Sequence, residues 1–543
     1  MHFNSARTGV RLEGPKPQWA RPDGGEAGLH PSNIHDCEYA IGSVNFTGDM
    51  PVILTRDGPS LGGFVCPVTI VKGELWKVGQ VKPGDKIRFV PISFEQALEL
   101  ERTQDRIVET LEDLPLPPLT AVHAPLTPVR GTPASPTILA EVAGDGATPK
   151  AVYRQAGDKY VLIEYGENVL DLNLRFRVHA LMEALRADPI PGVLEMSPGV
   201  RSLQIHYDSR IIHQRDLIEG LLAREASLPA VEDMKVRSRI VHLPLAFEDS
   251  ATLDAVARYR QSVRDTAPWL PSNTEFIRRI NGLSSVEEVR DIVYAASYMV
   301  LGLGDVYLGA PCAVPIDPRH RLLTSKYNPA RTYTAEGTVG IGGVYMCIYG
   351  MDSPGGYQLV GRTLPIWNKF LKNKVFIDGQ PWLLKFFDQV RFYPVDEPTL
   401  DRMREDFRAG RTSVEITEEL FDLREYNAFL KSIEPELADF RARQKQAFEA
   451  EVARWQAEDE AAQAETAAAD AHVVSADISG NVWKLLAEPG SVVKAGDPLL
   501  ILEAMKMEFH ISAPRDGVVS TFHCRTGMLI NAGDPLVSLK PAA

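Results

Sequence analysis

The spacing of hydrophobic and polar residues changes several times along the chain, and each spacing predicts a type of element. Residues 153–165 and 203–207 carry alternating or clustered apolar side chains, which predicts strands. Residues 172–187 and 254–264 repeat apolar side chains at helical spacing, which predicts helices. The segment before them is rich in strand and turn signals and ends in a charged, helix-like stretch at residues 95–114. The pattern indicates a β-dominated first unit followed by an α+β unit.

Two segments lack the pattern of a packed core. Residues 114–137 hold seven prolines among Thr, Ala and Ser, a composition that favours extended, solvated backbone and predicts a linker. From Leu430 to Trp455 apolar residues step by three and four, which predicts a long amphipathic helix. Residues 461–471 are almost all Ala and Glu, so we expect the helix to fray there into a flexible tether.

The last 73 residues contain an internal repeat with a period of 37 positions. Head-to-tail copies of one β-unit predict a two-fold symmetric sandwich of short strands. The first copy contains Gly480, Gly490, Ala495, Gly496, Asp497, Pro498 and Leu499, and the second contains Gly517, Gly527, Ala532, Gly533, Asp534, Pro535 and Leu536.

The two copies are joined by the sequence Glu-Ala-Met-Lys-Met-Glu, flanked by predicted strands, which places Lys506 at the tip of a hairpin. A primary amine on a rigid, protruding turn with a tether behind it suits a covalently attached group that travels between sites. These residues resemble the biotin carboxyl carrier family, in which the attachment lysine lies between two methionines, here Met505 and Met507. The resemblance covers residues 473–540 and implies covalent biotin on Lys506. Lipoyl carriers, the alternative, usually show an Asp-Lys-Ala turn.

Composition narrows the classes of function. The 543 residues suffice for three or four domains, and no apolar run approaches the roughly 18 residues of a membrane span. The N-terminus lacks the hydrophobic block of a secretory signal, so a cytoplasmic location is expected. A net charge of −14 argues against nucleic-acid and anionic-membrane partners. The five cysteines form no CxxC pair, so we expect neither a disulfide framework nor a metal site.

No nucleotide-binding motif accompanies the carrier-like segment. The chain has no GxxxxGK[ST] sequence and no GxGxxG that opens a helix. The glycine-rich residues 340–343 lead into a strand-like run and are interpreted as a turn inside a sheet. Because charging biotin with carbon dioxide requires ATP, we expect a biotin carboxylase, with its ATP, Mg and bicarbonate, on another domain or subunit.

Two further segments resemble the carboxyltransferase of urea carboxylases, residues 19–89 its first half and residues 192–363 its second half. The resemblance implies a mainly β multidomain chain with α+β parts. It consists of two cyclophilin-like β-barrel halves, the first truncated, then a helical linker and a C-terminal β-sandwich of the biotinyl/lipoyl-carrier (barrel-sandwich hybrid) type. Because the family's first half begins earlier, we expect the C-terminal part of a longer enzyme. The matching motifs include Asn45-Phe46-Thr47-Gly48-Asp49, Pro198-Gly199-Val200-Arg201, Gly302-Leu303-Gly304-Asp305 and Lys326-Tyr327-Asn328-Pro329-Ala330-Arg331.

The expected domain boundaries follow from these matches. They are 1–112 for the C-terminal part of the first half, which is similar to one component of 5-oxoprolinase; 113–150 for the Pro-rich linker; 151–364 for the second half, which is similar to another component of 5-oxoprolinase; 365–471 for an extension and long helical arm; and 472–543 for the carrier domain.

The activity implied by the resemblance is transfer of a carboxyl group from carboxybiotin to urea, giving N-carboxyurea (allophanate). Urea nitrogen is a poor nucleophile, so a site must orient it and accept its proton. Asp305, which lies among glycines, is the candidate catalytic and urea-binding carboxylate; the alternative is a turn aspartate that caps local amides. Asn45 favours urea over guanidine, because a neutral ligand needs a donor as well as an acceptor. A strand-edge asparagine is its structural alternative.

Three further candidates are less specific. His206, on a predicted strand, is a candidate for acting on the biotin ureido oxygen or on the leaving proton, or is a buried structural histidine. Tyr327 is a candidate catalytic phenol and Arg331 a candidate substrate-binding guanidinium. The adjacent His35 and Asp36 are interpreted as structural.

Several alternatives remain at this stage. A close variant takes guanidine as the acceptor. Another class is a 5-oxoprolinase-type hydrolase subunit, against which the Met-Lys-Met sequence argues. A third is a non-catalytic scaffold. The partners expected for a urea carboxylase are a biotin carboxylase domain or subunit, a biotin protein ligase, and an allophanate hydrolase acting downstream.

Overall fold

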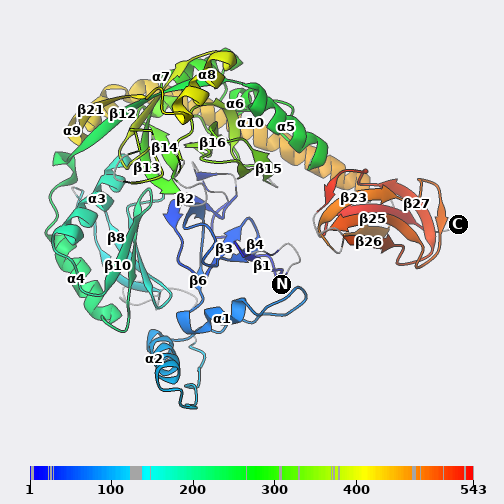
Figure 1. The fold of residues 1–543 in the computed structure, drawn as a ribbon, viewed down its shortest axis with the longest axis horizontal. Helices are drawn as coiled ribbons and strands as arrows, with labels where there is room; N and C mark the ends of the chain where they lie inside the picture. Colours follow the sequence, from blue (N-terminus) through cyan, green and yellow to red (C-terminus); the bar gives the residue numbers. More distant parts are fainter. Residues whose placement is uncertain are drawn as a thin grey trace.

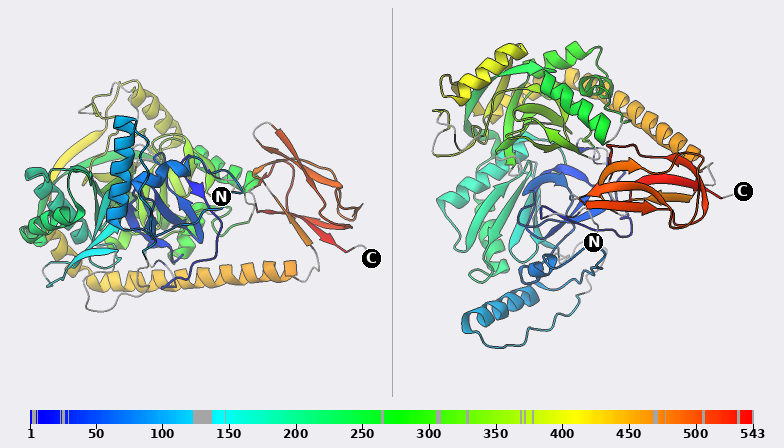
Figure 2. Two further views of the ribbon diagram at one scale, coloured as in Figure 1. Left: turned by 90° about the horizontal axis from the view of Figure 1, so that it is seen from below. Right: turned by 45° about the vertical axis from the view of Figure 1, so that its right-hand side comes forward.

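The computed structural model places a ring of β-rich units beside a long helix that leads to a separate C-terminal sandwich (Figures 1 and 2). It describes residues 1, 5, 7–22, 24, 27–28, 30–122, 137–146, 148–263, 266–304, 309–327, 330–367, 370, 373–376, 379–467, 472–476, 478–504, 507–530 and 533–541. Among these residues no helix combines the length and apolarity needed to cross a lipid bilayer.

The first segment is built from short strands. Its sheets are β1 (Val10–Arg11), β4 (Met50–Ile53), β3 (Ser43–Thr47) and β6 (Val68–Thr69) in one, and β2 (Asn33–Glu38) with β5 (Leu61–Phe64) in the other. The described strands of this segment do not close into a barrel. A short helix, α1 (Leu75–Val78), and the predicted charged helix, α2 (Phe94–Thr110), follow. Ser93 and Gln96 form a capping box that fixes where α2 begins.

The next unit is the predicted α+β layer. Its antiparallel sheet has the order β10 (Val193–Pro198), β11 (Ser202–Tyr207), β9 (Tyr160–Tyr165), β8 (Ala151–Ala156) and β7 (Ile138–Val142). Helices α3 (Leu172–Ala187) and α4 (Gln214–Ala226) contribute buried residues to the same core. Strand β7 lies inside the range expected to be the proline-rich linker, because its backbone extends the edge of this sheet by pairing with β8.

A closed seven-stranded barrel follows. Its order is β19 (Gln358–Arg362), β16 (Thr338–Gly342), β17 (Tyr345–Ile348), β14 (Ala310–Pro315), β13 (Ser297–Gly304), β20 (Gln389–Pro394) and β12 (Lys235–Phe247), and β12 pairs back with β19. Strand β21 (Glu415–Asp422) extends β12. The expected boundary at residue 364 therefore falls between strands of one sheet. Gly343, with a φ of +63°, makes the predicted turn between β16 and β17.

Helices and a small ribbon cover this barrel. The ribbon pairs β15 (Arg331–Thr334) with β18 (Ser353–Gly355). The helices are α5 (Ser250–Ser262), α6 (Asn273–Ile280), α7 (Val286–Ala295), α8 (Glu397–Arg408) and α9 (Leu423–Ser432).

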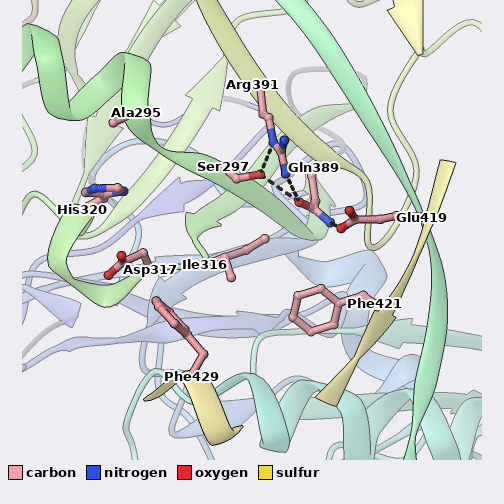
Figure 3. Close-up of a pocket in the computed structure, with 10 residues that line it drawn as sticks. All are labelled: Ala295, Ser297, Ile316, Asp317, His320, Gln389, Arg391, Glu419, Phe421 and Phe429. Carbon is pink, nitrogen blue, oxygen red and sulfur yellow. Dashed lines mark hydrogen bonds between the residues drawn. The ribbon is translucent and has the colours of Figure 1, made fainter. Parts of the chain in front are cut away.

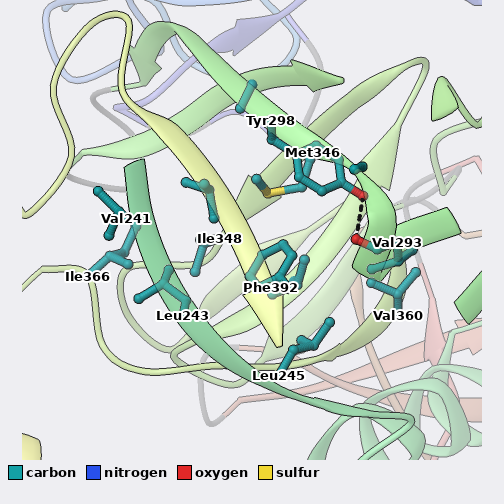
Figure 4. Close-up of a cluster of buried hydrophobic side chains, with 14 of the residues drawn as sticks. Val241, Leu243, Leu245, Val293, Tyr298, Met346, Ile348, Val360, Ile366 and Phe392 are labelled. Carbon is teal, nitrogen blue, oxygen red and sulfur yellow. Dashed lines mark hydrogen bonds between the residues drawn. The ribbon is translucent and has the colours of Figure 1, made fainter. Parts of the chain in front are cut away.

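The barrel interior is a continuous apolar core to which β12, β17, β20 and the helices contribute (Figure 4). Ile348 on β17 is fully buried in it, whereas Ile211, after β11, is 65% exposed. We expect Ile348→Ala to lower the free energy of unfolding by about 3 kcal/mol, since it removes buried methylenes and leaves a cavity. Urea unfolding followed by circular dichroism measures this change. Ile211→Ala is the matched control, and an equal loss in both variants would contradict the assignment of the core.

The predicted long helix is α10 (Glu434–Ala467). It packs on the barrel at α6, where Glu451 accepts from Arg279 at 2.9 Å and the Trp455 ring stacks on Phe276 with centroids 5.7 Å apart. The expected fraying from residue 461 was wrong as far as Ala467, because the backbone there keeps its helical form. Residues 468–471 lie outside the described residues.

The C-terminal sandwich confirms the two-fold repeat. One sheet has the order β22 (His472–Ser475), β29 (Pro535–Lys540), β27 (Gly517–Phe522), β24 (Val492–Val493), and the other β26 (Met507–Ser512), β25 (Pro498–Ala504), β23 (Gly480–Leu485), β28 (Leu529–Ile530). Gly496 and its repeat partner Gly533 both have a φ of +93°. Only glycine adopts such a backbone readily, which explains why these positions recur.

Candidate functional site

The hairpin between the two sandwich repeats presents the predicted attachment position. Strands β25 and β26 pair antiparallel up to Ala504 opposite Met507. Two residues, Met505 and Lys506, stand between these paired positions, and both lie outside the described residues. The register of the described strands fits a group carried on a short hairpin, because the sheet on either side fixes where the connection emerges.

The short strand β5 is the place where two of the predicted site segments meet. Asn45, on β3, is 3% exposed; its Nδ2 lies 3.6 Å from Cys66 Sγ, and its Oδ1 accepts from the Thr47 hydroxyl at 3.0 Å. Cys66 follows β5 and lies 3.9 Å from the carbonyl oxygen of Phe64. Burial raises the pKa of the Cys66 thiol to about 12, so the surroundings of Asn45 are neutral.

The barrel hairpin β13–β14 reaches the same ribbon from the other side. Asp305 itself lies outside the described residues, but it directly follows Gly304 at the end of β13. A Cβ on Gly302 would lie 3.1 Å from Leu61 on β5, so glycine permits this close approach. Cys312 Sγ on β14 lies 3.4 Å from Asp36 Oδ2 on β2. The contacts bring the Asp305 hairpin to the β2–β5 ribbon beside Asn45.

A lysine that sequence reasoning did not single out lies at the same ribbon. The Lys326 ammonium sits 5.4 Å from the ring centroids of Phe64 on β5 and of Tyr357. Asp36, interpreted from the sequence as structural, faces this region with its carboxylate. Lys326 is in a motif that matched the family, but the choice of Tyr327 and Arg331 rested on residue type alone.

His206 lies elsewhere on the described contacts. Its ring stacks on Tyr160 with centroids 4.5 Å apart on the α+β sheet. Burial lowers its pKa, which favours the neutral imidazole. No described contact joins His206 to Asn45 or to the barrel hairpin.

Tyr327 and Arg331 engage protein groups rather than open space. Tyr327 is 5% exposed, and its hydroxyl pairs with the Asn273 side-chain amide at 2.6 Å. Burial raises its pKa, so the phenol is neutral. Arg331 is 1% exposed and donates to the Tyr357 carbonyl at 2.6 Å, while its guanidinium lies 4.3 Å from the centroid of the Tyr327 ring. Both side chains stabilise the segment that follows Lys326.

His35 is buried, as a structural residue would be. Its Nδ1 lies 2.5 Å from the Tyr345 hydroxyl on β17, so it joins β2 to the barrel. Burial, together with Arg201 and other arginines, lowers its pKa to about 4, and the imidazole is neutral near pH 7.

A pocket of about 360 Å³ opens on the outer side of the barrel and is separate from this ribbon (Figure 3). Arg391 and Gln389 of β20 line it together with Phe421 and Glu419 of β21, and Arg391 donates to Ser297 at 3.1 Å. It contains none of the residues predicted from the sequence. The described residues hold no cluster of His, Cys, Asp and Glu suited to a metal ion.

Family models match three parts of the chain. They are described as carboxyltransferase domain, subdomain A and B, for residues 1–91; carboxyltransferase domain, subdomain C and D, for residues 151–377; and biotin-requiring enzyme, for residues 472–539. These matches and the barrel and sandwich architectures confirm the predicted fold class.

Curated relatives match almost the whole chain. A urea amidolyase of Lachancea kluyveri is 48% identical over 98% of this chain and 29% of its own length, and a putative urea carboxylase of Emericella nidulans is 38% identical over 99% and 46%. The crystal structure of the Kluyveromyces lactis urea carboxylase superposes with a TM-score of 0.77 at 44% identity, covering 99% of this chain and 47% of that one. The chain thus spans less than half the length of each.

Proposed function

This chain belongs to the family of urea amidolyases and urea carboxylases, and we propose that it transfers a carboxyl group from biotin on Lys506 to urea, giving N-carboxyurea. The observation that carries the proposal is that carboxyltransferase subdomains and a biotin-carrier sandwich occur in one chain. Biotin, when attached, supplies the carboxyl group on a ureido nitrogen. The hairpin between β25 and β26, with Met505 and Met507 beside the lysine, is the part that holds it.

Asn45 and Asp305 bind and orient urea in this proposal. The Asn45 amide offers both a donor and an acceptor, as a neutral carbonyl compound with NH2 groups requires. Asp305 accepts hydrogen bonds from urea N–H groups and takes up the proton as the nitrogen attacks. Support comes from the described contacts that bring β3 and the β13–β14 hairpin to β5. Close packing at this ribbon excludes water, which strengthens such hydrogen bonds.

The other sequence-predicted residues have separate roles. We assign Tyr327 and Arg331 to holding the segment after Lys326 in place, on the basis of their hydrogen bonds to Asn273 and to the backbone. His206 is retained as a candidate proton acceptor, since its lowered pKa keeps the imidazole neutral. Its position on the α+β sheet would require a movement of the carrier or the sheet to bring it to the reacting atoms.

The partners follow from the chemistry of the proposal. A biotin carboxylase domain or subunit, using ATP, Mg and bicarbonate, must carboxylate the carrier, and a biotin protein ligase must first attach biotin to Lys506. N-carboxyurea is an unstable carbamate, so a hydrolase for allophanate is the expected consumer of the product.

A transfer assay tests the proposed function. Biotinylated chain is mixed with a separate biotin carboxylase, ATP, Mg and labelled bicarbonate, and then with urea or guanidine. We expect labelled product to form with urea and to depend on all components. Transfer to guanidine alone would assign the chain to the guanidine variant. Transfer to neither, with the carrier shown to be carboxylated, would leave the scaffold interpretation.

Asn45→Asp tests the assignment of the acceptor. The substitution places a carboxylate in a buried, neutral pocket beside the Cys66 thiol, where it needs a cationic ligand to balance its charge. We expect the ratio of guanidine to urea turnover to rise by about tenfold or more, a difference of roughly 1.4 kcal/mol. Initial rates with each acceptor measure the ratio. Asn45→Ala is the control, which should slow both acceptors; a ratio that Asn45→Asp leaves unchanged would refute the role of Asn45.

A further inference from the structure

Lys326 has the surroundings of a cation that waits for an anion. Its ammonium lies between the rings of Phe64 and Tyr357, 5.4 Å from each centroid. Phe64 comes from β5 of the first carboxyltransferase segment, and Tyr357 immediately precedes β19 of the barrel. The side chain therefore bridges the two parts of the site. No carboxylate of the described residues forms an ion pair with it.

The carboxylate in its neighbourhood is held by other groups. A Cβ on Gly63 would lie 2.8 Å from Asp36 Oδ1 and 3.8 Å from Lys326 Nζ, so both groups border this glycine. Asp36 Oδ2 is instead in contact with Cys312 Sγ, at 3.4 Å. The two charges thus face the same region without pairing. Aromatic walls exclude water on two sides of the ammonium, which strengthens its attraction for an anion.

Unpartnered polar atoms beside Lys326 give a second, independent observation. Ser325 Oγ and Gln358 Oε1 are both buried and have no hydrogen-bond partner among the described residues. They are neighbours, because Gln358 Nε2 donates to the Ser325 carbonyl at 2.8 Å. Buried polar atoms are nearly always paired in native proteins, so a water or ligand group belongs here. A hydroxyl donor next to an ammonium suits the oxygen atoms of a carboxylate.

We propose that Lys326, with Ser325 beside it, forms the subsite for the carboxylate group that is transferred. The inference rests on the proposed function and adds the anion-binding residue of that site. In the transfer, the urea nitrogen bonds to the carboxyl carbon and the bond from that carbon to the carrier-borne nitrogen breaks. The proton lost by urea ends on that carrier-borne nitrogen. The carboxylate bears one negative charge before and after, so one fixed cation holds it in both states.

Binding of malonamate to the chain without biotin tests this subsite. Malonamate is a stable analogue of N-carboxyurea in which CH2 replaces NH. We expect Lys326→Met to weaken its binding by at least about tenfold in calorimetry, as loss of a charge-assisted contact predicts. Lys326→Arg keeps the charge and should restore part of the affinity. Neutral malonamide should bind both forms alike. Lys484→Met, on the exposed side of β23, is the control and should bind malonamate like the unchanged chain.

A measurement on the unchanged chain guards against a variant that fails to fold. Reductive methylation of lysines, read by mass spectrometry, should modify Lys326 more slowly with malonamate than with malonamide. No detectable malonamate binding, equal binding by Lys326→Met, or absence of protection would each overturn the inference. Lys326-dependent malonamate binding by a chain that carboxylates neither urea nor guanidine would contradict the proposed function and leave the anion subsite standing.

Discussion

Lys506→Arg is expected to abolish both biotin attachment and carboxyl transfer. Attachment needs a primary amine that loses a proton and forms an amide, whereas the arginine guanidinium stays protonated in proteins. The hairpin pairing of Ala504 with Met507 does not depend on the lysine, so the sandwich should unfold at an unchanged temperature. Intact mass of protein produced with an active biotin ligase, followed by the transfer assay, measures both losses.

The control for this variant is Lys484→Arg on β23, an exposed lysine of the same domain, which should keep full biotinylation and turnover. If the Lys506→Arg protein still gained the mass of one biotin, the attachment site would lie elsewhere. The transfer scheme would then lose its donor.

Asp305→Asn is expected to lower urea-dependent transfer about a hundredfold or more while biotinylation and carrier carboxylation stay normal. The amide keeps the shape of the side chain but removes its charge and its ability to accept a proton. Loss of one positioned polar group in an active site typically costs about 10²–10³ in rate. Single-turnover transfer from a pre-carboxylated carrier isolates this step from the charging reaction.

Asp254→Asn, on the exposed face of α5, is the matched control, because Asp254 makes only a surface ion pair with Arg258. It should leave transfer unchanged. Normal single-turnover transfer by Asp305→Asn would show that another group accepts the proton, with His206 the next candidate.

Local patterns predicted elements with strong periodicity well. Helix α3 spans Leu172–Ala187, the range predicted from its apolar spacing, and Asp171 caps its first turn. The repeat at the C-terminus predicted the sandwich because recurring glycines mark backbone conformations that few other residues adopt. Local patterns failed where pairing decided the outcome. Strand β7 lies in the range expected to be a linker, since polar, proline-containing sequence around it hides a segment that needs β8 to become a strand.

Long-range pairing also explains why the site was only partly predicted. Asn45 and the Asp305 hairpin came from motifs, but the Asp36–Cys312 contact joins residues 276 positions apart. Nothing in the local pattern indicated that Tyr327 and Arg331 point into the protein while Lys326 points between two aromatic rings. Residue type indicates which chemistry is available, but not which neighbour of a motif faces the site.

The amino-acid sequence alone determined that this chain carries a duplicated β-unit with a lysine between its copies, and that carboxyltransferase motifs precede it. Those features are local, since turns, repeats and short motifs depend on neighbouring residues. The tertiary structure alone decided that β12 closes the barrel with β20 and β19, and that Lys326 stands beside β5 of a distant segment. Such contacts join residues more than a hundred positions apart, and their stability comes from packing that no local pattern encodes.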